Sequence, residues 1–447
     1  MGGVSGAVRG RLVTIIILVI GCLLLLVGAG QRLVDAYERF KSADYITAIS
    51  LVMAGVPRDA LPVTLLDVDD ATRAAWGNPR TTPHAALARL VEESAKLGAS
   101  MVVTDFDLSS EVPGTEGDEA LLKVLEEYRP EWPHLLLARR ISFSRGEGAE
   151  AFVAQDSAVT PYDAAVQGKP NIHWITTLND IGGDRQVRRV RSWQTVCVAA
   201  EGKAYPSAVL LASALLYAKQ PHLVELEAFL KSRGESDCGK TTEAHLAWPN
   251  FDGQAITIPY MIADRHDTRS MFRIERDGKE TVVMRRIRAG QIVTFEGGTA
   301  ALSGELDADP FKDRVVLIGA THADTSDFYN TPLGTMPGVL IIANSVIQAK
   351  GITDTEPMGW WLSNILALGL FLIYAYIVRN LQSSLALAAI GVVSVIALFI
   401  ISRLFSFYDG VNVVAVAVPG FALFKLIDSL AQIAMDIPRR GWRSIFN

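Results

Sequence analysis

Acidic side chains gather where three β-rich stretches of the 447-residue chain end. The stretches are residues 61–70, 100–108 and 314–321, each of strand length and each carrying several Val, Leu or Ile side chains. If they form parallel strands, their carboxyl ends share one edge of a sheet, where open α/β folds place ligands. The sequence therefore predicts a ligand-binding edge formed by these side chains: Asp67, Asp69, Asp70, Asp105, Asp107, His322, Asp324 and Asp327.

The identity of a ligand at this edge stays open. Clustered carboxylate oxygens suit a hard cation such as Mg²⁺ or Ca²⁺, or a cationic ligand. The alternative is that the aspartates cap helices and turns, a common role of this residue type. Sequence alone does not decide between a metal site and capping.

The sequence gives no support for zinc-dependent, nucleophilic or nucleotide-dependent chemistry. The seven histidines lack the pairwise spacing of a zinc site. No nucleophile elbow, Walker A motif or dinucleotide-binding glycine pattern is present. These observations favour a binding domain without a cofactor over an enzyme, with a metal-dependent hydrolase as a minor alternative.

The elements around the edge alternate between strands and helices. Helices are predicted over residues 82–99 and 118–128, and a further strand over residues 134–141. Such alternation is typical of an α/β fold in which a parallel or mixed sheet is flanked by helices.

Three further segments of this region are predicted with other roles. Residues 205–220 read as a buried core helix with Pro206 in its first turn. Residues 146–168 read as a polar insert, and residues 232–242 as a loop. A disulfide between Cys197 and Cys238 would suit an oxidising compartment, but sequence does not tell whether the two thiols approach each other.

Long apolar runs lie at both ends of the chain. Residues 12–30 carry no charge, and 19 residues suffice to cross about 30 Å of hydrocarbon as a helix. Three more spans are predicted over residues 360–378, 385–405 and 411–435. The short gaps between the last three predict a tight bundle of helices in the lipid bilayer.

Arginines next to the predicted spans set their orientation. They lie within residues 1–11, between the second and third spans, and within the short basic tail 436–447. Because cationic residues favour the cytoplasmic side, both termini are predicted to be cytoplasmic and residues 31–359 to lie outside. That outer segment is not basic and the net charge of the chain is −6, so nucleic acid is not expected as a partner.

The last predicted span carries polar side chains on one helical face. Lys425, Asp428 and Gln432 fall at a spacing of three and four residues. Such a face could turn toward another helix of a partner or of a second copy of the chain. The alternative is a helix end that already projects into the headgroups, with Lys425 reaching the aqueous surface.

The stretch from residue 313 to residue 344 resembles the type-two CHASE domain, an extracytoplasmic sensor found on bacterial cyclases and kinases. The resemblance rests on a strand that ends in V-L-I-G, an aspartate beside an aromatic residue, a Thr-Pro turn and a helix that contains an Ala-Asn pair. In this sequence the matching residues are Val316 to Gly319, Asp327, Phe328, Thr331, Pro332, Gly334, Pro337, Gly338, Val339, Ala343 and Asn344.

The first part of the outer segment follows the same family pattern. Asp67 to Asp70, the turn at residues 77–80, His84, and Phe106 with Asp107 appear in the family's order. One span before the sensor and three after it also agree, and the resemblance implies a bacterial inner (cytoplasmic) membrane protein. Within the motif, Thr331 to Gly338 could either form part of the ligand edge or only fix the turn into the next helix.

Two features depart from the family pattern. Ile342 stands where family members often carry a histidine, and the chain ends about a dozen residues after its last span, where an output domain typically follows. The expectation is therefore a sensor that signals to a partner protein in trans. An envelope scaffold or complex subunit that senses nothing is the alternative.

Overall fold

The structure is a computed structural model. It describes residues 60–108, 118–145, 152–156, 160–181, 185–198, 201–216, 220–237, 255–258, 260–262, 271–276, 279–325, 327–349 and 360–380, with short pieces at 389–394, 396–397, 400 and 417. The chain divides into two compact units. One is Gly55–Asp354, and the other combines Met1–Ala54 with Thr355–Asn447.

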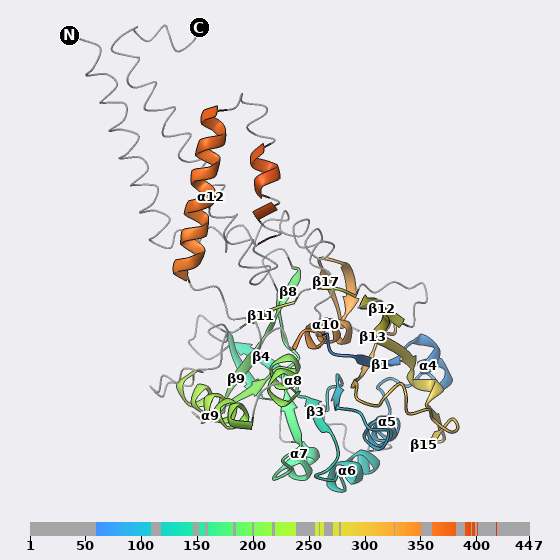
Figure 1. The fold of residues 1–447 in the computed structure, drawn as a ribbon. Helices are drawn as coiled ribbons and strands as arrows, with labels where there is room; N and C mark the ends of the chain where they lie inside the picture. Colours follow the sequence, from blue (N-terminus) through green and yellow to red (C-terminus); the bar gives the residue numbers. More distant parts are fainter. Residues whose placement is uncertain are drawn as a thin grey trace, which may run out of the picture. The chain divides into compact units, whose positions relative to one another are not determined.

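A seven-stranded sheet forms the centre of the unit Gly55–Asp354 (Figure 1). All neighbouring strands are parallel except the first pair, which is antiparallel. Their order across the sheet is β12 (Met271–Arg276), β13 (Lys279–Arg288), β1 (Val63–Val68), β16 (Val315–Ala320), β2 (Met101–Thr104), β3 (His134–Ala138) and β6 (Ile172–Ile175). The α/β class and the mixed sheet predicted from the sequence are therefore confirmed.

The order of the strands differs from the simplest expectation. The edge was predicted on the condition that β1 and β2 are parallel neighbours, but β16 lies between them and pairs with both. Their carboxyl ends still lie on one edge of the sheet, because all three strands are parallel. β16 can take this place because its buried run Val315 to Gly319 presents apolar side chains to both faces of the sheet.

Helices cover both faces of the sheet. One face packs against α5 (His84–Lys96), α6 (Asp118–Glu126) and α7 (Pro161–Val166) through a core that includes Leu66, Val102 and Leu135. α10 (Gly338–Val346) lies over β16, where the side chain of Val339 meets Gly319, and α8 (Ala208–Leu216) contacts α10. Because successive strand residues point to opposite faces, Val63, Leu65 and Asp67 share the face that carries α10.

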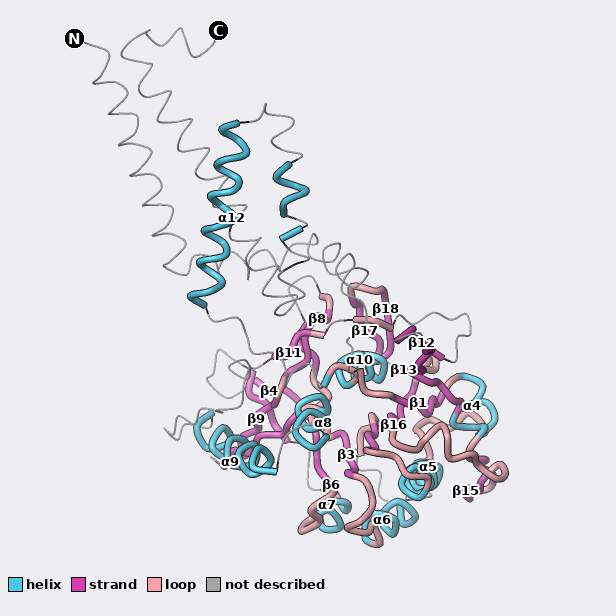
Figure 2. The backbone as a smooth tube through the Cα atoms, in the orientation of Figure 1, coloured by secondary structure: helices cyan, strands magenta, loops and turns pink. Residues whose placement is uncertain are grey.

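Smaller elements complete this unit, as the tube in Figure 2 shows. They are α4 (Asp70–Ala75), α9 (Gln220–Asp237), a 3₁₀ turn at Ala289–Gln291, β11 (Ala255–Thr257) with β8 (Val187–Arg191) and β7 (Asn179–Ile181), and the hairpins β4–β5 (Ile141–Arg145, Phe152–Asp156), β9–β10 (Trp193–Val198, Glu201–Pro206), β14–β15 (Val293–Glu296, Thr299–Leu302) and β17–β18 (Phe328–Thr331, Gly334–Pro337).

Three sequence predictions for this unit need correction. The helix predicted from residue 205 begins at Ala208, because Pro206 ends β10 instead of entering a helix. The predicted insert 146–168 contains β5 and α7, whose start at Pro161 follows a capping box at Thr160. The predicted loop from residue 232 is helical as far as Asp237, since α9 continues through it.

The other unit contains α12 (Trp360–Asn380). Among the described residues, Trp361–Asn380 is the one helix long and apolar enough to cross a membrane, with a mean hydropathy of 1.9. Ala367, Phe371 and Tyr374 are buried, while Trp361, Ile365 and Tyr376 are exposed. An exposed apolar face on such a helix supports the predicted span at residues 360–378.

The remaining predicted spans stay predictions. Residues 12–30 lie outside the described part of the chain, and so does nearly all of 411–435. Within 385–405, residues 389–394 are helical, and the hydroxyl of Ser394 lies 2.6 Å from that of Tyr374.

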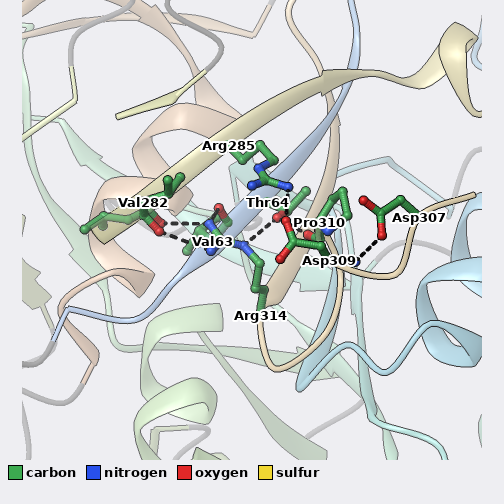
Figure 3. Close-up of polar contacts among 9 residues, drawn as sticks. Val63, Thr64, Val282, Arg285, Asp307, Asp309, Pro310 and Arg314 are labelled. Atoms are coloured by element: carbon green, nitrogen blue, oxygen red, sulfur yellow. Dashed lines mark hydrogen bonds and ion pairs between the residues drawn. The ribbon is translucent and has the colours of Figure 1, made fainter. Parts of the chain in front are cut away.

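Arg314 fastens the central strands at their amino ends (Figure 3). Its guanidinium donates to the carbonyl oxygens of Val63 in β1 at 2.7 Å and of Val282 in β13 at 3.1 Å. It also donates to the hydroxyl of Thr64 at 2.8 Å, and that hydroxyl donates to the carbonyl oxygen of Pro310 at 2.5 Å. Burial lowers the pKa of Arg314 to about 10, so the guanidinium stays charged at neutral pH.

Arg314→Met should destabilise the protein by about 2–4 kcal/mol, because each buried polar group left without a partner costs about 1–3 kcal/mol. The free energy of unfolding of the detergent-solubilised chain in urea would measure the effect. Arg140→Met is the matched control, since it makes the same substitution in an ion pair with Asp107 in which Arg140 is 64% exposed. Equal losses in the two variants would contradict the proposed importance of Arg314.

Candidate functional site

Asp67 lies at the carboxyl end of β1 and is almost fully buried. One carboxylate oxygen accepts from Nε of Arg286 at 2.5 Å, and the other from the hydroxyl of Thr321 at 2.7 Å. Arg286 also donates to Thr321 at 2.7 Å, which closes a ring of three hydrogen-bonded side chains. Burial raises the pKa of Asp67, although Arg286 and Thr321 act in the opposite direction.

The neighbouring aspartates are also engaged within the protein. Asp69 caps α4 by accepting from the backbone N–H of Thr72 at 2.8 Å, and it pairs with Arg288 at 2.9 Å. Asp70 accepts from the backbone N–H of Ala323 at 3.0 Å. These contacts fix the turn that follows β1.

The loop after β16 brings in His322 and Asp324. Asp324 pairs with Arg73 of α4 and is 67% exposed. Burial lowers the pKa of His322, and the charge of Arg73 lowers it further. The lowered pKa favours the neutral imidazole, and the buried Nδ1 of His322 has no hydrogen-bond partner among the described residues.

Asp105 and Asp107, which follow β2, have different surroundings. Asp107 pairs with Arg140 at 3.2 Å on the exposed rim. Asp105 lies next to Asp327, and burial together with the charge of Asp327 raises the pKa of Asp105. Burial also raises the pKa of Asp327, although the hydrogen bond of Tyr329 and the nearby backbone N–H of Gly338 act in the opposite direction.

Seven of the eight predicted residues thus fall into two groups at one edge of the sheet, while Asp107 lies apart on the rim with Arg140. Asp67 at the end of β1 and Asp105 just after β2 lie on either side of β16 and share its α10-facing side with Gly319. The first group surrounds Asp67 and is accompanied by arginines, whereas the second consists of Asp105 and Asp327. Among the described residues, no three acidic, histidine or cysteine side chains gather as a metal site would require.

Sequence reasoning missed the arginines that accompany the first group. Arg286 and Arg288 come from β13, a strand that was not predicted, and Arg73 comes from α4. A signal was present: residues 281–288 read T-V-V-M-R-R-I-R, a strand-like run with two arginines two residues apart on one face. Tyr329, next to Asp327 in the structure, was also not identified.

The family-like motif forms the hairpin β17–β18 and α10. Asp327 closes the base of the hairpin, since its carbonyl oxygen accepts from the N–H of Gly338 at 2.9 Å. A side chain at Gly338 would collide with the carboxylate of Asp327. At the tip, the hydroxyl of Thr331 donates to the carbonyl oxygen of Gly334 at 2.6 Å, beside Pro332. The segment from Thr331 to Pro337 thereby leads directly into α10.

Asn344 of α10 organises a distant segment. Its side-chain oxygen accepts from the N–H groups of Met261 at 2.8 Å and Ile262 at 2.9 Å. Its side-chain nitrogen donates to the carbonyl oxygens of Ile262 at 3.0 Å and Leu340 at 2.8 Å. Ile342, at the position where the family resemblance leads to the expectation of a histidine, is buried and only 6% exposed.

Two further predicted sites include residues outside the described part of the chain. The pairing of Cys197 with Cys238 is untested, because Cys238 lies outside the described residues. The same holds for the face formed by Lys425, Asp428 and Gln432.

Comparison with known families shows to which family the chain belongs. The family model of the CHASE2 domain matches residues 13–378, well over half of the 447 residues. The chain belongs to the CHASE2 family. CHASE2 domains are extracytoplasmic sensory domains, which agrees with a membrane protein and confirms the resemblance inferred from the motif. No curated protein and no solved structure matches the chain.

The CHASE2 motif can now be understood from packing. In V-L-I-G the last residue is Gly319, and a Cβ there would lie 2.5 Å from Cγ2 of Val339. The absent side chain lets the first turn of α10 rest directly on β16.

Gly319→Ala should destabilise the protein by about 1–3 kcal/mol, the usual cost of overpacking a tight contact. Gly304→Ala is the control, because no atom lies within 4 Å of a Cβ at this exposed position. Urea unfolding of both variants would measure the difference. If Gly319→Ala were as harmless as Gly304→Ala, the close approach of α10 and β16 would be wrong.

A second prediction concerns two histidines at the amino ends of β3 and β6. Nδ1 of His134 lies 3.1 Å from Nε2 of His173, and the rings stack. Burial lowers both pKa values, that of His173 to about 4. The native state therefore binds these protons less readily than the unfolded chain, so stability is retained above about pH 6.5 and falls as the pH drops toward 4.

His173→Gln should flatten the dependence of the unfolding free energy on pH in this window. The absolute stability of the variant is not the readout, since the substitution also changes a hydrogen bond. Parallel pH profiles for the variant and the unmodified protein would exclude the histidine pair as the origin of acid sensitivity.

Proposed function

We propose that this CHASE2 protein is a membrane-bound sensor. Its outer unit binds a ligand or a protein at the aspartate edge and passes the resulting change through its membrane helices to a partner protein that carries the output. The partner, the ligand and the passage through the membrane are parts of the proposal.

The observation that carries the proposal is the position of α10. Its first residue, Gly338, contacts Asp327 at the edge. Just after its last turn, the carbonyl oxygen of Ile347 accepts from the N–H of Leu61 at 2.8 Å. Leu61 and Ile347 lie close to the two ends of the unit, Gly55 and Asp354. A nine-residue helix of about 13 Å therefore joins the candidate edge to the place where both connections toward the predicted spans begin.

α10 is suited to transmit a displacement as a rigid body. All nine of its residues are buried, and packed helices shift between discrete positions more readily than they deform. A ligand that prefers one position of the hairpin β17–β18 would bias α10 and both chain connections together. Such differential binding is what signalling requires.

The partner side of the proposal rests on the sequence. The predicted polar face of Lys425, Asp428 and Gln432 and the basic tail 436–447 offer contacts for a membrane or cytoplasmic partner. No catalytic role is assigned to the chain itself. The rival function is an envelope scaffold whose contacts do not depend on the edge.

Proximity labelling in intact cells would test the proposal. A biotin ligase fused to the C-terminus, which is predicted to be cytoplasmic, would mark neighbouring proteins in cells that carry the unmodified chain, Asp327→Asn or Asp309→Asn. We expect a kinase, cyclase or transcription regulator whose labelling changes about 5-fold or more with Asp327→Asn, the lower range of coupling between linked sites. Asp309→Asn, the same substitution away from the edge, should leave that labelling unchanged.

The scaffold gives a different result in the same experiment. It predicts an identical set of labelled envelope proteins for all three chains. That outcome would overturn the sensing proposal.

A further inference from the structure

Asp105 and Asp327 are two carboxyl groups that distant parts of the chain bring together. Asp105 directly follows β2, and its N–H donates to the carbonyl oxygen of Ile318 in β16 at 2.8 Å. Asp327 starts the hairpin β17–β18 and is bonded to Gly338 at the start of α10. The end of β2 and the base of the hairpin therefore meet at this pair.

The approach of the two carboxyl groups is enforced by close packing. Asp105 follows Thr104, which pairs with Ile318, so it lies beside Gly319 on the face that α10 covers. Val339 rests on Gly319, and the preceding residue, Gly338, abuts the carboxylate of Asp327. α10 thus presses Asp327 toward the strand next to Asp105.

The groups that face the pair provide no positive charge. The hydroxyl of Tyr329 is hydrogen-bonded to Asp327, and the side chain of Asn179 in β7 is hydrogen-bonded to Tyr329. The N–H of Gly338 faces Asp327 from α10. Within the described part of the chain, no arginine or lysine acts on this pair, in contrast to Asp67, which has Arg286.

We propose that Asp105 and Asp327 form a proton-controlled switch at the junction between the sheet edge and α10. With a proton shared between them, the two carboxyl groups hold the hairpin base against the end of β2. When the proton is lost, two adjacent carboxylates repel each other, and Asp327 with the start of α10 is released from the edge. The input is then the proton concentration of the compartment that surrounds the outer unit.

The direction of the effect follows from the pair's ionisation. Burial and the neighbouring charge raise the pKa of Asp105 to about 8, far above the value near 4 of an aspartate in an unfolded chain. The native state therefore binds more protons than the unfolded state between these values, and the stabilisation is lost as the pH rises toward 8. This trend is opposite in sign to that of His134 and His173.

The switch names a form of regulation for the same edge and in that sense rests on the proposed function. The test of the switch does not depend on the proposed function, because proton binding can be measured on the purified chain without a partner or ligand. A failure of the switch would leave the labelling experiment unaffected. A failure of the labelling experiment would leave a proton-sensitive edge without a known output.

Hydrogen exchange of the full-length protein in detergent, followed by mass spectrometry, would test the switch from about pH 5 to about pH 9. The peptides of interest cover β17, β18 and the first turn of α10. The variant is Asp105→Asn, which mimics the protonated carboxyl group, and the control is Asp107→Asn, two residues further along and paired with Arg140. Intrinsic exchange rates cancel, because these peptides are identical in all three proteins and are compared at equal pH.

We expect the three proteins to exchange alike at low pH. Near pH 9 the unmodified protein and Asp107→Asn should exchange these peptides about 10-fold faster than Asp105→Asn, the equivalent of one pKa unit. Equal exchange in Asp105→Asn and the unmodified protein at every pH would overturn the proposal. So would an Asp107→Asn variant that suppresses exchange as strongly as Asp105→Asn.

A second variant guards against a folding defect. If Asp105→Asn did not fold, Asp327→Asn would remove the same repulsion from the other partner and should give the same slow exchange near pH 9. Fast exchange near pH 9 in a folded Asp327→Asn protein would overturn the switch.

Discussion

The hydrogen bonds of Arg314 are the constraint on which the central sheet depends. A guanidinium that is withdrawn from water needs partners, and here they are carbonyl oxygens of β1 and β13. The three strands β13, β1 and β16 must therefore pair before the guanidinium of Arg314 has its hydrogen-bond partners. At the opposite ends of the same strands, Asp67, Arg286 and Thr321 form a second closure. The sheet is thus fastened at both ends by buried and half-buried polar side chains and filled by aliphatic ones in between.

This fastening explains why the motif from Val316 to Asn344 relies on small and turn-forming residues where α10 approaches the sheet. With β16 fixed between β1 and β2, the helix α10 reaches it only where side chains are absent or short. Gly319 and Gly338 provide these two points of approach, one against Val339 and the other against Asp327. The motif therefore sets how closely α10 approaches the edge. That distance in turn determines the surroundings of the acidic residues near α10.

The sequence allowed several of these features to be predicted, and physical reasons limit the rest. Buried strands such as β1 and β16 and the amphipathic helix α5 carry local periodic signals, so their existence was predictable. The gathering of the aspartates at one edge followed from parallel strands. The insertion of β16 between β1 and β2 did not, because strand order depends on pairing between distant segments. The arginines of β13 were missed for the same reason, and Pro206 shifted the start of α8 because it completes the β9–β10 hairpin.

The central strands also have a consequence for the time course of folding. Arg286 and Asp67 are separated by 219 residues, and Arg314 and Thr64 by 250. Closing such long loops is slow, since chain entropy is lost before the contacts form. During synthesis β1 emerges early but has neither of its neighbours until β13 and β16 follow, so its backbone hydrogen-bonding groups stay unpaired in the meantime. The domain is therefore most exposed to aggregation in the interval before its last strands arrive, and a chaperone that covers a strand edge would act in that interval.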